Sequence, residues 1–380
     1  EWLLRIDISV ETCSEHYRNA LTKLRNNRVD EDEALGWKRR VGILLGSLSG
    51  IGVLGMMGIR SLNYNPPARV ELSPECLRPG KVLKPGDEFS VLSWNLQFAG
   101  SREQEFFYDG GSAVHVDETI TRRTMQAIAG LIEKYSPDVV FLQEVDRDSE
   151  RTGRIDQLQA YLGAGDWACF NSTPYHRSRY LPHPAGQHLG RVDMHLAVLS
   201  RFALEPGERI ALPGLQEGWL RRQFNLKRAL QWLTLPVEGA APIRLGNTHL
   251  SAFSDGDGTL AHQVGVLESW LGQDESWVLA GDMNMLPPGD DRGRLPDGGA
   301  AYADDPNPME RLQPDRYDVA RGDLLNEQAR TYLPFGAEEP LKKIDYLLSS
   351  DRLELVEQSV LREASELSDH LPIWAKYRVR

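Results

Sequence analysis

The sequence predicts a layered α/β domain preceded by a single membrane-spanning helix. Residues 89–96 and 139–145 are short apolar runs, and residues 119–135 between them place apolar side chains at helical spacing, so strand, helix and strand follow in order. Residues 41–59 form a run of 19 residues without a charge, long enough to cross a bilayer as a helix. Residues 61–86 contain five prolines, a composition typical of linkers, and separate the two parts.

Length and charge limit the classes of protein that this chain can represent. A chain of 380 residues with 41% hydrophobic and 26% charged residues has the composition of a globular protein with a full core. Its formal net charge is −12. An acidic surface repels phosphate backbones and disfavours tight non-specific binding of nucleic acid, but it does not exclude attack on a small phosphate ester.

The cysteines predict neither a structural zinc site nor a disulfide framework. Cys13, Cys76 and Cys169 are widely spaced and form none of the close pairs that bind zinc. We expect them to be unpaired, although an odd number also leaves an intermolecular bond open.

The predicted membrane helix, residues 41–60, also orients the chain. It carries six glycines, a density more usual in membrane helices than in soluble ones. A basic cluster at residues 38–40 precedes it and only Arg60 follows closely. The positive-inside rule therefore places the polar segment 1–40 in the cytoplasm and residues 61–380 on the non-cytoplasmic side. A signal-like stretch is an alternative; a buried soluble helix is disfavoured, because each glycine costs about 1 kcal/mol relative to alanine.

After the linker, residues 61–87, the pattern of an α/β domain continues over residues 88–380. The helix at 119–135 has Met125, Ile128 and Ile132 on one face, and the strand that follows it ends near Glu144. The same criteria predict further strands at 194–200, 229–235, 243–250, 277–280, 343–348, 356–362 and 373–379, and further helices at 156–162 and 263–271. Residues 101–115 and 171–193 are predicted to be loops.

Polar or ionisable residues stand at the ends of these apolar runs. Asp282 and Asn284 follow the strand at 277–280, and residues two apart in an extended segment point the same way. Singly, each such residue has an ordinary explanation as a turn residue or a solvated strand end. Together they form a set that is unlikely to arise independently: Asn95, Glu144, His249, Asp282, Asn284, Asp345, Asp369 and His370.

The chain resembles the endonuclease/exonuclease/phosphatase superfamily, which includes deoxyribonucleases, abasic-site endonucleases, inositol polyphosphate phosphatases and neutral sphingomyelinases. The matching residues occur in the order of the family: Trp94-Asn95, Leu142-Gln143-Glu144, Asn247-Thr248-His249-Leu250, Gly281-Asp282-Met283-Asn284, Ile344-Asp345-Tyr346 and Ser368-Asp369-His370. The resemblance implies a four-layer α/β sandwich, in which two packed mixed sheets are flanked by helices.

The resemblance and the chemistry of the residues together imply a metal site. Glu144 is expected to hold a divalent ion, with Asn95 and Asp369 as its near neighbours. Oxygen ligands of this kind suit Mg²⁺, with Mn²⁺ as an alternative.

The remaining residues are expected to act on water and phosphate. Asp282 is the candidate for orienting or deprotonating the attacking water, and His370, held by Asp345, is the rival base. His249 and Asn284 are expected to donate hydrogen bonds to the phosphate oxygens. No Ser, Cys or Thr nucleophile is indicated, so we expect direct attack by water.

The substrate is less well specified. The predicted loop 171–193 is rich in basic and aromatic residues. It forms either a wall that contacts phosphate and a headgroup or a solvated surface loop. The first hypothesis is a membrane-anchored, Mg²⁺-dependent phosphoesterase that acts on a phosphodiester or phosphomonoester, with a lipid headgroup as an attractive substrate. A nuclease of the same fold and a catalytically inactive binding module are the alternatives; nucleic acid is the less favoured partner.

Overall fold

The computed structural model describes residues 31–252, 256–272, 275–295, 299–302, 304 and 306–380, and it divides the chain into two compact units, Glu1–Ser61 and Leu62–Arg380. Helix α2 (Glu31–Leu62) contains the predicted apolar run. Its span Trp37–Leu62 is long and apolar enough to cross a membrane, and none of that apolar window is buried. The predicted helix over residues 41–60 is therefore present; residues 1–30 of the predicted polar segment lie outside the described residues.

The second unit contains two mixed sheets. The first has the strand order β12 (Leu353–Val360), β13 (Ile373–Val379), β3 (Glu88–Asn95), β4 (Val139–Asp146), β6 (Gly190–Ser200), β5 (Cys169–Leu181) and β2 (Glu75–Cys76). The second has the order β1 (Arg69–Leu72), β7 (Glu205–Ala211), β8 (Ala229–Leu235), β9 (Ile243–His249), β10 (Ser276–Asp282) and β11 (Asp345–Ser349). The neighbours β3 and β4, and likewise β9 and β10, are parallel, while the other described pairs are antiparallel.

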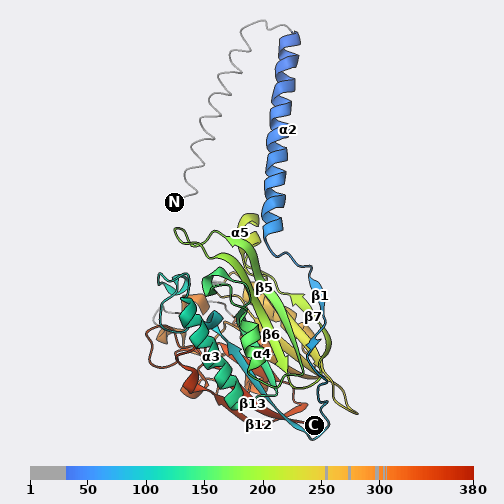
Figure 1. Ribbon diagram of the computed structural model, residues 1–380, viewed down its shortest axis with the longest axis vertical. Coiled ribbons are helices and arrows are strands. Elements are labelled where there is room, and N and C mark those ends of the chain that lie inside the picture. Colours follow the sequence, from blue (N-terminus) through green and yellow to red (C-terminus); the bar gives the residue numbers. More distant parts are fainter. Residues whose placement is uncertain (1–30, 253–255, 273–274, 296–298, 303, 305) are drawn as a thin grey trace. The chain divides into compact units, whose positions relative to one another are not determined.

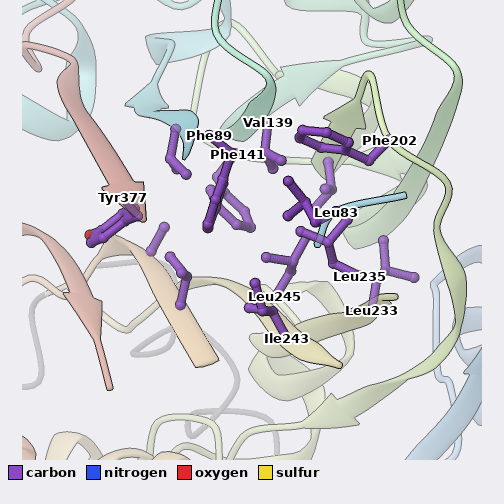
Figure 2. Close-up of a cluster of buried hydrophobic side chains, with 14 of the residues drawn as sticks. Leu83, Phe89, Val139, Phe141, Phe202, Leu233, Leu235, Ile243, Leu245 and Tyr377 are labelled. Atoms are coloured by element: carbon purple, nitrogen blue, oxygen red, sulfur yellow. The ribbon is translucent and has the colours of Figure 1, made fainter. Parts of the chain in front are cut away.

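The sheets pack face to face and helices cover their outer faces. Phe141 of the first sheet and Leu233 and Leu245 of the second belong to one buried cluster (Figure 2). A second cluster joins the first sheet to α3 (Glu118–Tyr135) and α4 (Gln157–Gly163), which lie over it in Figure 1, and a third joins the second sheet to α6 (Thr259–Trp270). Two short helices complete the described unit, α5 (Trp219–Phe224) and α7 (Pro314–Tyr317). The predicted four-layer α/β sandwich is confirmed.

Helix α3 shows how the local sequence sets an element. The side chain of Asp117 accepts a hydrogen bond from Thr119 N at 2.8 Å and so caps the first turn. Met125, Ile128 and Ile132 are buried on one face, as their spacing predicts. The helix ends at Tyr135, and the next residue, Ser136, has a left-handed φ of 48°.

The Pro-rich segment contributes an edge strand to each sheet. Strand β1 pairs with β7, with Arg69 opposite Ile210, and β2 pairs with β5. The residues from Leu62 onward thus belong to the same compact unit as the sandwich. The linker composition of residues 61–87 reflects the extended, proline-tolerant conformation of edge strands.

The expectation of unpaired cysteines is wrong for two of the three. Cys76 and Cys169 are opposite each other in the register of β2 and β5 and form a disulfide across a sequence separation of 93 residues. Sequence spacing does not reveal such a pair, because it depends on strand pairing. A cross-link over a loop of this length stabilises the fold by about 4–5 kcal/mol in the chain-entropy treatment.

The predicted loop at 171–193 is also corrected. Most of it is β5 and the start of β6, which form a long antiparallel hairpin from Cys169 opposite Ser200 to Leu181 opposite Gly190. Arg177 and Arg179 are exposed and alternate with the buried His176 and Ser178. This two-residue period is the signature of a strand, although the exposed positions are basic rather than merely polar.

Candidate active site

The site lies where two pairs of parallel strands end. Asn95 is the last residue of β3 and Glu144 lies near the end of the neighbouring β4; His249 and Asp282 are the last residues of β9 and β10. Parallel strands end at the same edge of a sheet, and the register places Asp282 directly opposite both His249 and Asp345. Because the sheets pack face to face, these four strand ends meet at one end of the sandwich.

Gly281 allows β9 and β10 to approach each other at this point. Its φ is 150°, and a Cβ at this position would lie 2.0 Å from the carbonyl oxygen of Thr248. Any other residue would push the two strands apart. The glycine therefore sets the distance between His249 and Asp282.

Glu144 is directed into the site by an irregularity in β4. The register with β6 shifts between Leu142 and Val145, and Glu144 itself has a φ of 57°. A bulge of this kind re-aims a side chain. Here it brings Glu144 Oε1 to 3.2 Å from Asn95 Nδ2, which also donates to Asp282 Oδ2 at 3.1 Å.

Two histidines flank Asp282. His249 Nε2 lies 3.3 Å and His370 Nε2 lies 3.7 Å from Asp282 Oδ2. The other nitrogen of His370, Nδ1, forms a 2.8 Å hydrogen bond with Asp345 Oδ2. Asp345 is held in turn by the hydroxyl of Thr331, which donates to the same oxygen at 2.6 Å. The backbone of His370 is fixed by Trp94 Nε1, which donates to its carbonyl oxygen at 2.8 Å.

Asn284 and Asp369 complete the predicted set. The backbone N–H of Asn284 donates to Asp282 Oδ1 at 2.9 Å, and its side-chain amide donates to Leu250 O at 3.1 Å. Asp369 Oδ1 lies 3.9 Å from His370 Nε2, the same nitrogen that lies near Asp282. Asp369 is also anchored by its backbone N–H, which donates to Gln97 Oε1.

All eight predicted residues converge. A cavity of about 1150 Å³ is lined by six of them: Glu144, His249, Asp282, Asn284, Asp369 and His370. The other two are buried directly behind it, since Asn95 contacts Glu144 and Asp282, and Asp345 contacts His370.

Crowded carboxylates dominate the electrostatics of the cavity. Burial raises the pKa of Asp282 to about 7, and the nearby charge of Asp345 adds to the effect while His370 opposes it. Burial likewise raises the pKa of Asp369 to about 7; Asp109 and Glu144 contribute and His370 again opposes. Both groups are therefore difficult to ionise in the absence of an additional positive charge.

The two histidines differ in their affinity for protons. Burial and the neighbouring Arg228 hold the pKa of His249 well below its usual value, so this imidazole is neutral. Burial also opposes the charge of His370, but Asp345, Asp282 and Asp369 outweigh it and hold its pKa well above the usual value. One histidine is thus a neutral hydrogen-bonding group and the other is a cation.

The donor chemistry of the cavity fits a hard divalent cation. Glu144 and Asp369 supply oxygen ligands, with the amide of Asn95 beside Glu144. A bound dication would offset the burial and the neighbouring negative charges that raise the pKa of the buried carboxylates. Asp282, Asp345 and His370 also lie close enough together to hold an ion. We favour the first set, because Asp345 Oδ2 and His370 Nδ1 already bond to each other at 2.8 Å.

The sequence did not identify several residues that support the site. Thr331 orients Asp345, and nothing in its sequence surroundings marks it. The buried hydroxyl of Tyr175 lies 3.1 Å from His249 Nδ1, and Arg228 lies over the ring of Tyr175. Arg151 lines the cavity and forms a buried ion pair with Asp146. Tyr175 lies in the stretch 171–193, which the sequence shows to be basic and aromatic, but only the fold shows that its side chain is buried.

Comparisons with known proteins agree with this geometry. A model of the Endonuclease/Exonuclease/phosphatase family matches residues 92–370. No curated protein matches the chain. An endonuclease/exonuclease/phosphatase from Beutenbergia cavernae DSM 12333 is 22% identical with a TM-score of 0.55, covering 77% of this chain and 72% of that chain. The human Nocturnin catalytic domain with bound sulfate is 16% identical with a TM-score of 0.48, covering 81% and 97%. At 22% identity, the Beutenbergia cavernae structure shows a shared fold.

Proposed function

The chain belongs to the endonuclease/exonuclease/phosphatase family, whose members are phosphoesterases, and from this premise we propose that it is a membrane-anchored, divalent-metal-dependent phosphoesterase. The observation that carries the proposal is the convergence of eight chemically matched side chains, from strands far apart in the sequence, on one cavity. A structural role alone does not require four carboxylates, two histidines and two amides at such distances.

The proposed reaction is direct attack of water on phosphorus. Asp282 accepts a proton from the attacking water, the new bond between oxygen and phosphorus forms, and the bond to the leaving alcohol breaks. His370 is held as a cation by Asp345, Asp282 and Asp369, so it has no lone pair with which to act as a base. We therefore assign the role of base to Asp282. The cation of His370 is assigned to stabilise negative charge on the phosphate.

His249 is proposed to donate a hydrogen bond to the phosphate. If the hydroxyl of Tyr175 donates to Nδ1, 3.1 Å away, the neutral ring carries its proton on Nε2, which faces Asp282 and the cavity. Asn284 is proposed to assist from the same side. These donors are fixed in place before the substrate arrives, as electrostatic stabilisation requires.

Glu144, with Asn95 and Asp369 beside it, is proposed to hold Mg²⁺ or Mn²⁺. Such an ion neutralises phosphate charge and stabilises the leaving oxygen when bound.

The cavity and the apolar helix together favour a phosphate ester attached to a lipid. Apolar side chains line much of the cavity beside the catalytic groups, among them Leu181, Met194 and Phe224. A net charge of −12 opposes the tracking of a nucleic-acid backbone. An enzyme fastened to a bilayer also meets its lipids at high effective concentration.

A substrate panel tests the proposed function. The purified full-length chain should hydrolyse a generic soluble phosphodiester and a phospholipid or sphingomyelin headgroup in the presence of Mg²⁺, and EDTA should abolish both activities. Hydrolysis is measured as released phosphate ester or alcohol, with single- and double-stranded DNA in parallel. Cleavage of DNA without lipid turnover would instead identify a nuclease, and metal-independent or absent hydrolysis of every substrate would rule the proposal out.

We further propose that residues 62–380 lie on the non-cytoplasmic side. The basic cluster at residues 38–40 supports this orientation through the positive-inside rule. The Cys76–Cys169 disulfide supports it independently, because such bonds persist in oxidising compartments and are rare in the cytosol.

Thiol labelling tests the orientation, with Cys13 as an internal control on the other side of the membrane. In intact cells that express the chain, a membrane-impermeant maleimide should modify none of the cysteines. Permeabilisation should expose Cys13, and Cys76 and Cys169 should react only after a reductant is added; intact mass after proteolysis distinguishes the sites. Labelling of Cys13 from outside, or of Cys76 in permeabilised cells without reductant, would contradict the proposed topology.

A further inference from the structure

The chain that leaves helix α2 is fastened at once to the hairpin beside the cavity. Asn63, the residue after the end of α2, forms a β-bridge with Ser178, and Tyr64 N donates to Arg177 O at 2.9 Å. The ring of Tyr64 also lies 5.9 Å from the guanidinium of Arg177. There is thus no free spacer after α2. If α2 spans the membrane, as proposed above, the bilayer surface lies within a few residues of Ser178.

Two elements that border the cavity lie next to this attachment point. Leu181, at the end of β5, is three residues from Ser178, a distance of roughly 10 Å along a strand. Helix α5 is tied to the same strand, since His176 Nε2 lies 3.0 Å from Phe224 O and Lys227 N donates to Tyr175 O at 2.6 Å. Figure 1 shows α5 at one end of the sandwich and β12 at the opposite end.

The surface of these elements combines exposed apolar rings with unpaired cations. On α5, Trp219 is 38% and Leu220 is 54% exposed, and on β5 Tyr180 is 49% exposed. Three arginines accompany them, Arg179, Arg221 and Arg222, and none has an ion-pair partner among the described residues. We call these six residues the α5–hairpin surface.

This composition is that of a surface that lies in a bilayer interface. Trp and Tyr concentrate at the level of lipid headgroups, and each cation near an anionic leaflet contributes about 1 kcal/mol. In a protein whose net charge is −12, a cluster of three unpaired arginines beside an exposed tryptophan is complementary to anionic phospholipid. A second protein partner would not explain its position next to the end of α2.

The α5–hairpin surface also adjoins the mouth of the cavity. Leu181, Pro182 and His183 from the hairpin, and Arg221 and Phe224 from α5, line the cavity. We propose that the α5–hairpin surface is a second membrane contact, which docks on anionic phospholipid and turns the cavity mouth toward the bilayer. The inference rests on the proposed function and deepens it: the substrate enters from the membrane rather than from solution.

Fluorescence quenching tests the contact without reference to catalysis. The full-length protein is reconstituted in vesicles of phosphatidylcholine and phosphatidylglycerol, with brominated phosphatidylcholine as the quencher. We expect Trp219→Phe to lose a distinct part of the quenching observed for the wild type, because Trp219 would lie at the depth of the headgroups. Equal quenching of the two proteins would overturn the proposal.

Hydrolysis tests the consequence of the contact. In the same vesicles, Trp219→Ser combined with Arg222→Ser should lower the rate on a bilayer phosphodiester by about tenfold, and leave the rate on a soluble phosphodiester unchanged. Val356→Ser is the matched control, since Val356 is 42% exposed on β12 at the opposite end and should affect neither rate. An unchanged lipid rate in the double variant, or an equal loss on both substrates, would overturn the proposal. A wild-type protein inactive on both substrates would refute the proposed function, while the quenching would still decide the membrane contact.

Discussion

Replacement of Asp282 by asparagine should lower kcat by about 10³–10⁴-fold and change KM much less. The substitution preserves the shape of the side chain and one of its two accepted hydrogen bonds, from Asn95 Nδ2 or from Asn284 N, but it removes the only group proposed to accept the proton of the attacking water. His370→Gln should also reduce kcat strongly, through lost stabilisation of phosphate charge. Steady-state rates on a soluble phosphodiester over a range of pH measure both effects.

The pH profile separates the two candidate bases. If Asp282 is the base, kcat of the wild type should rise with pH to a plateau as this carboxyl group ionises. Asp282→Asn should lose the plateau of kcat at alkaline pH. His370→Gln should retain the rise of kcat on the acidic side, which Asp282 sets. Asp166→Asn, at an exposed carboxylate paired with Arg78, is the matched control and should leave the profile unchanged. Wild-type activity in Asp282→Asn, with its fold intact by circular dichroism, would remove Asp282 from the reaction and return His370 to the role of base.

The candidate site was largely predictable because its residues interrupt apolar runs. Asn95, Glu144, His249 and Asp282 each end a stretch that must be buried, and a polar side chain there needs a reason to be present. Parallel strands then bring such ends together without any knowledge of side-chain contacts. The local sequence therefore contains most of the information that identifies the proposed catalytic groups.

The parts that escaped prediction depend on contacts between distant segments. Thr331 lies 14 residues before Asp345 in a segment without regular strands, and its role follows only from the hydrogen bond to Asp345 Oδ2. The Cys76–Cys169 disulfide requires the pairing of β2 with β5. Strand β5 itself was missed because its exposed face carries arginines, which are rarer in strands than the Val, Ile and Thr that a strand prediction relies on.

Replacement of Glu144 by glutamine should raise the concentration of Mg²⁺ required for half-maximal activity on the order of 100-fold or more. The amide retains the size of the side chain but removes the negative charge that is proposed to hold the ion, and it can still lie beside Asn95 Nδ2, which is 3.2 Å from Glu144 Oε1 in the wild type. Activity titrated with Mg²⁺ after removal of metal by EDTA measures the change. Glu238→Gln, at an exposed glutamate beside Lys84, is the control and should titrate like the wild type.

The stability of the metal-free protein should depend on pH, and Glu144→Gln should change how stability responds to Mg²⁺. Asp282 and Asp369 have pKa values of about 7 in the metal-free fold, above the usual value of 3.8, so the folded state retains their protons where the unfolded chain has lost them. The metal-free protein should therefore lose stability as pH rises from about 4 to about 7, at about 1.4 kcal/mol per pH unit for each such group, and change little above that range. Mg²⁺ should raise the melting temperature of the wild type more at pH 8 than at pH 5, because it favours the ionised carboxylates. A melting temperature that responds equally to Mg²⁺ in Glu144→Gln would place the ion elsewhere in the cavity, with Asp282, Asp345 and His370 as the ligands to test next.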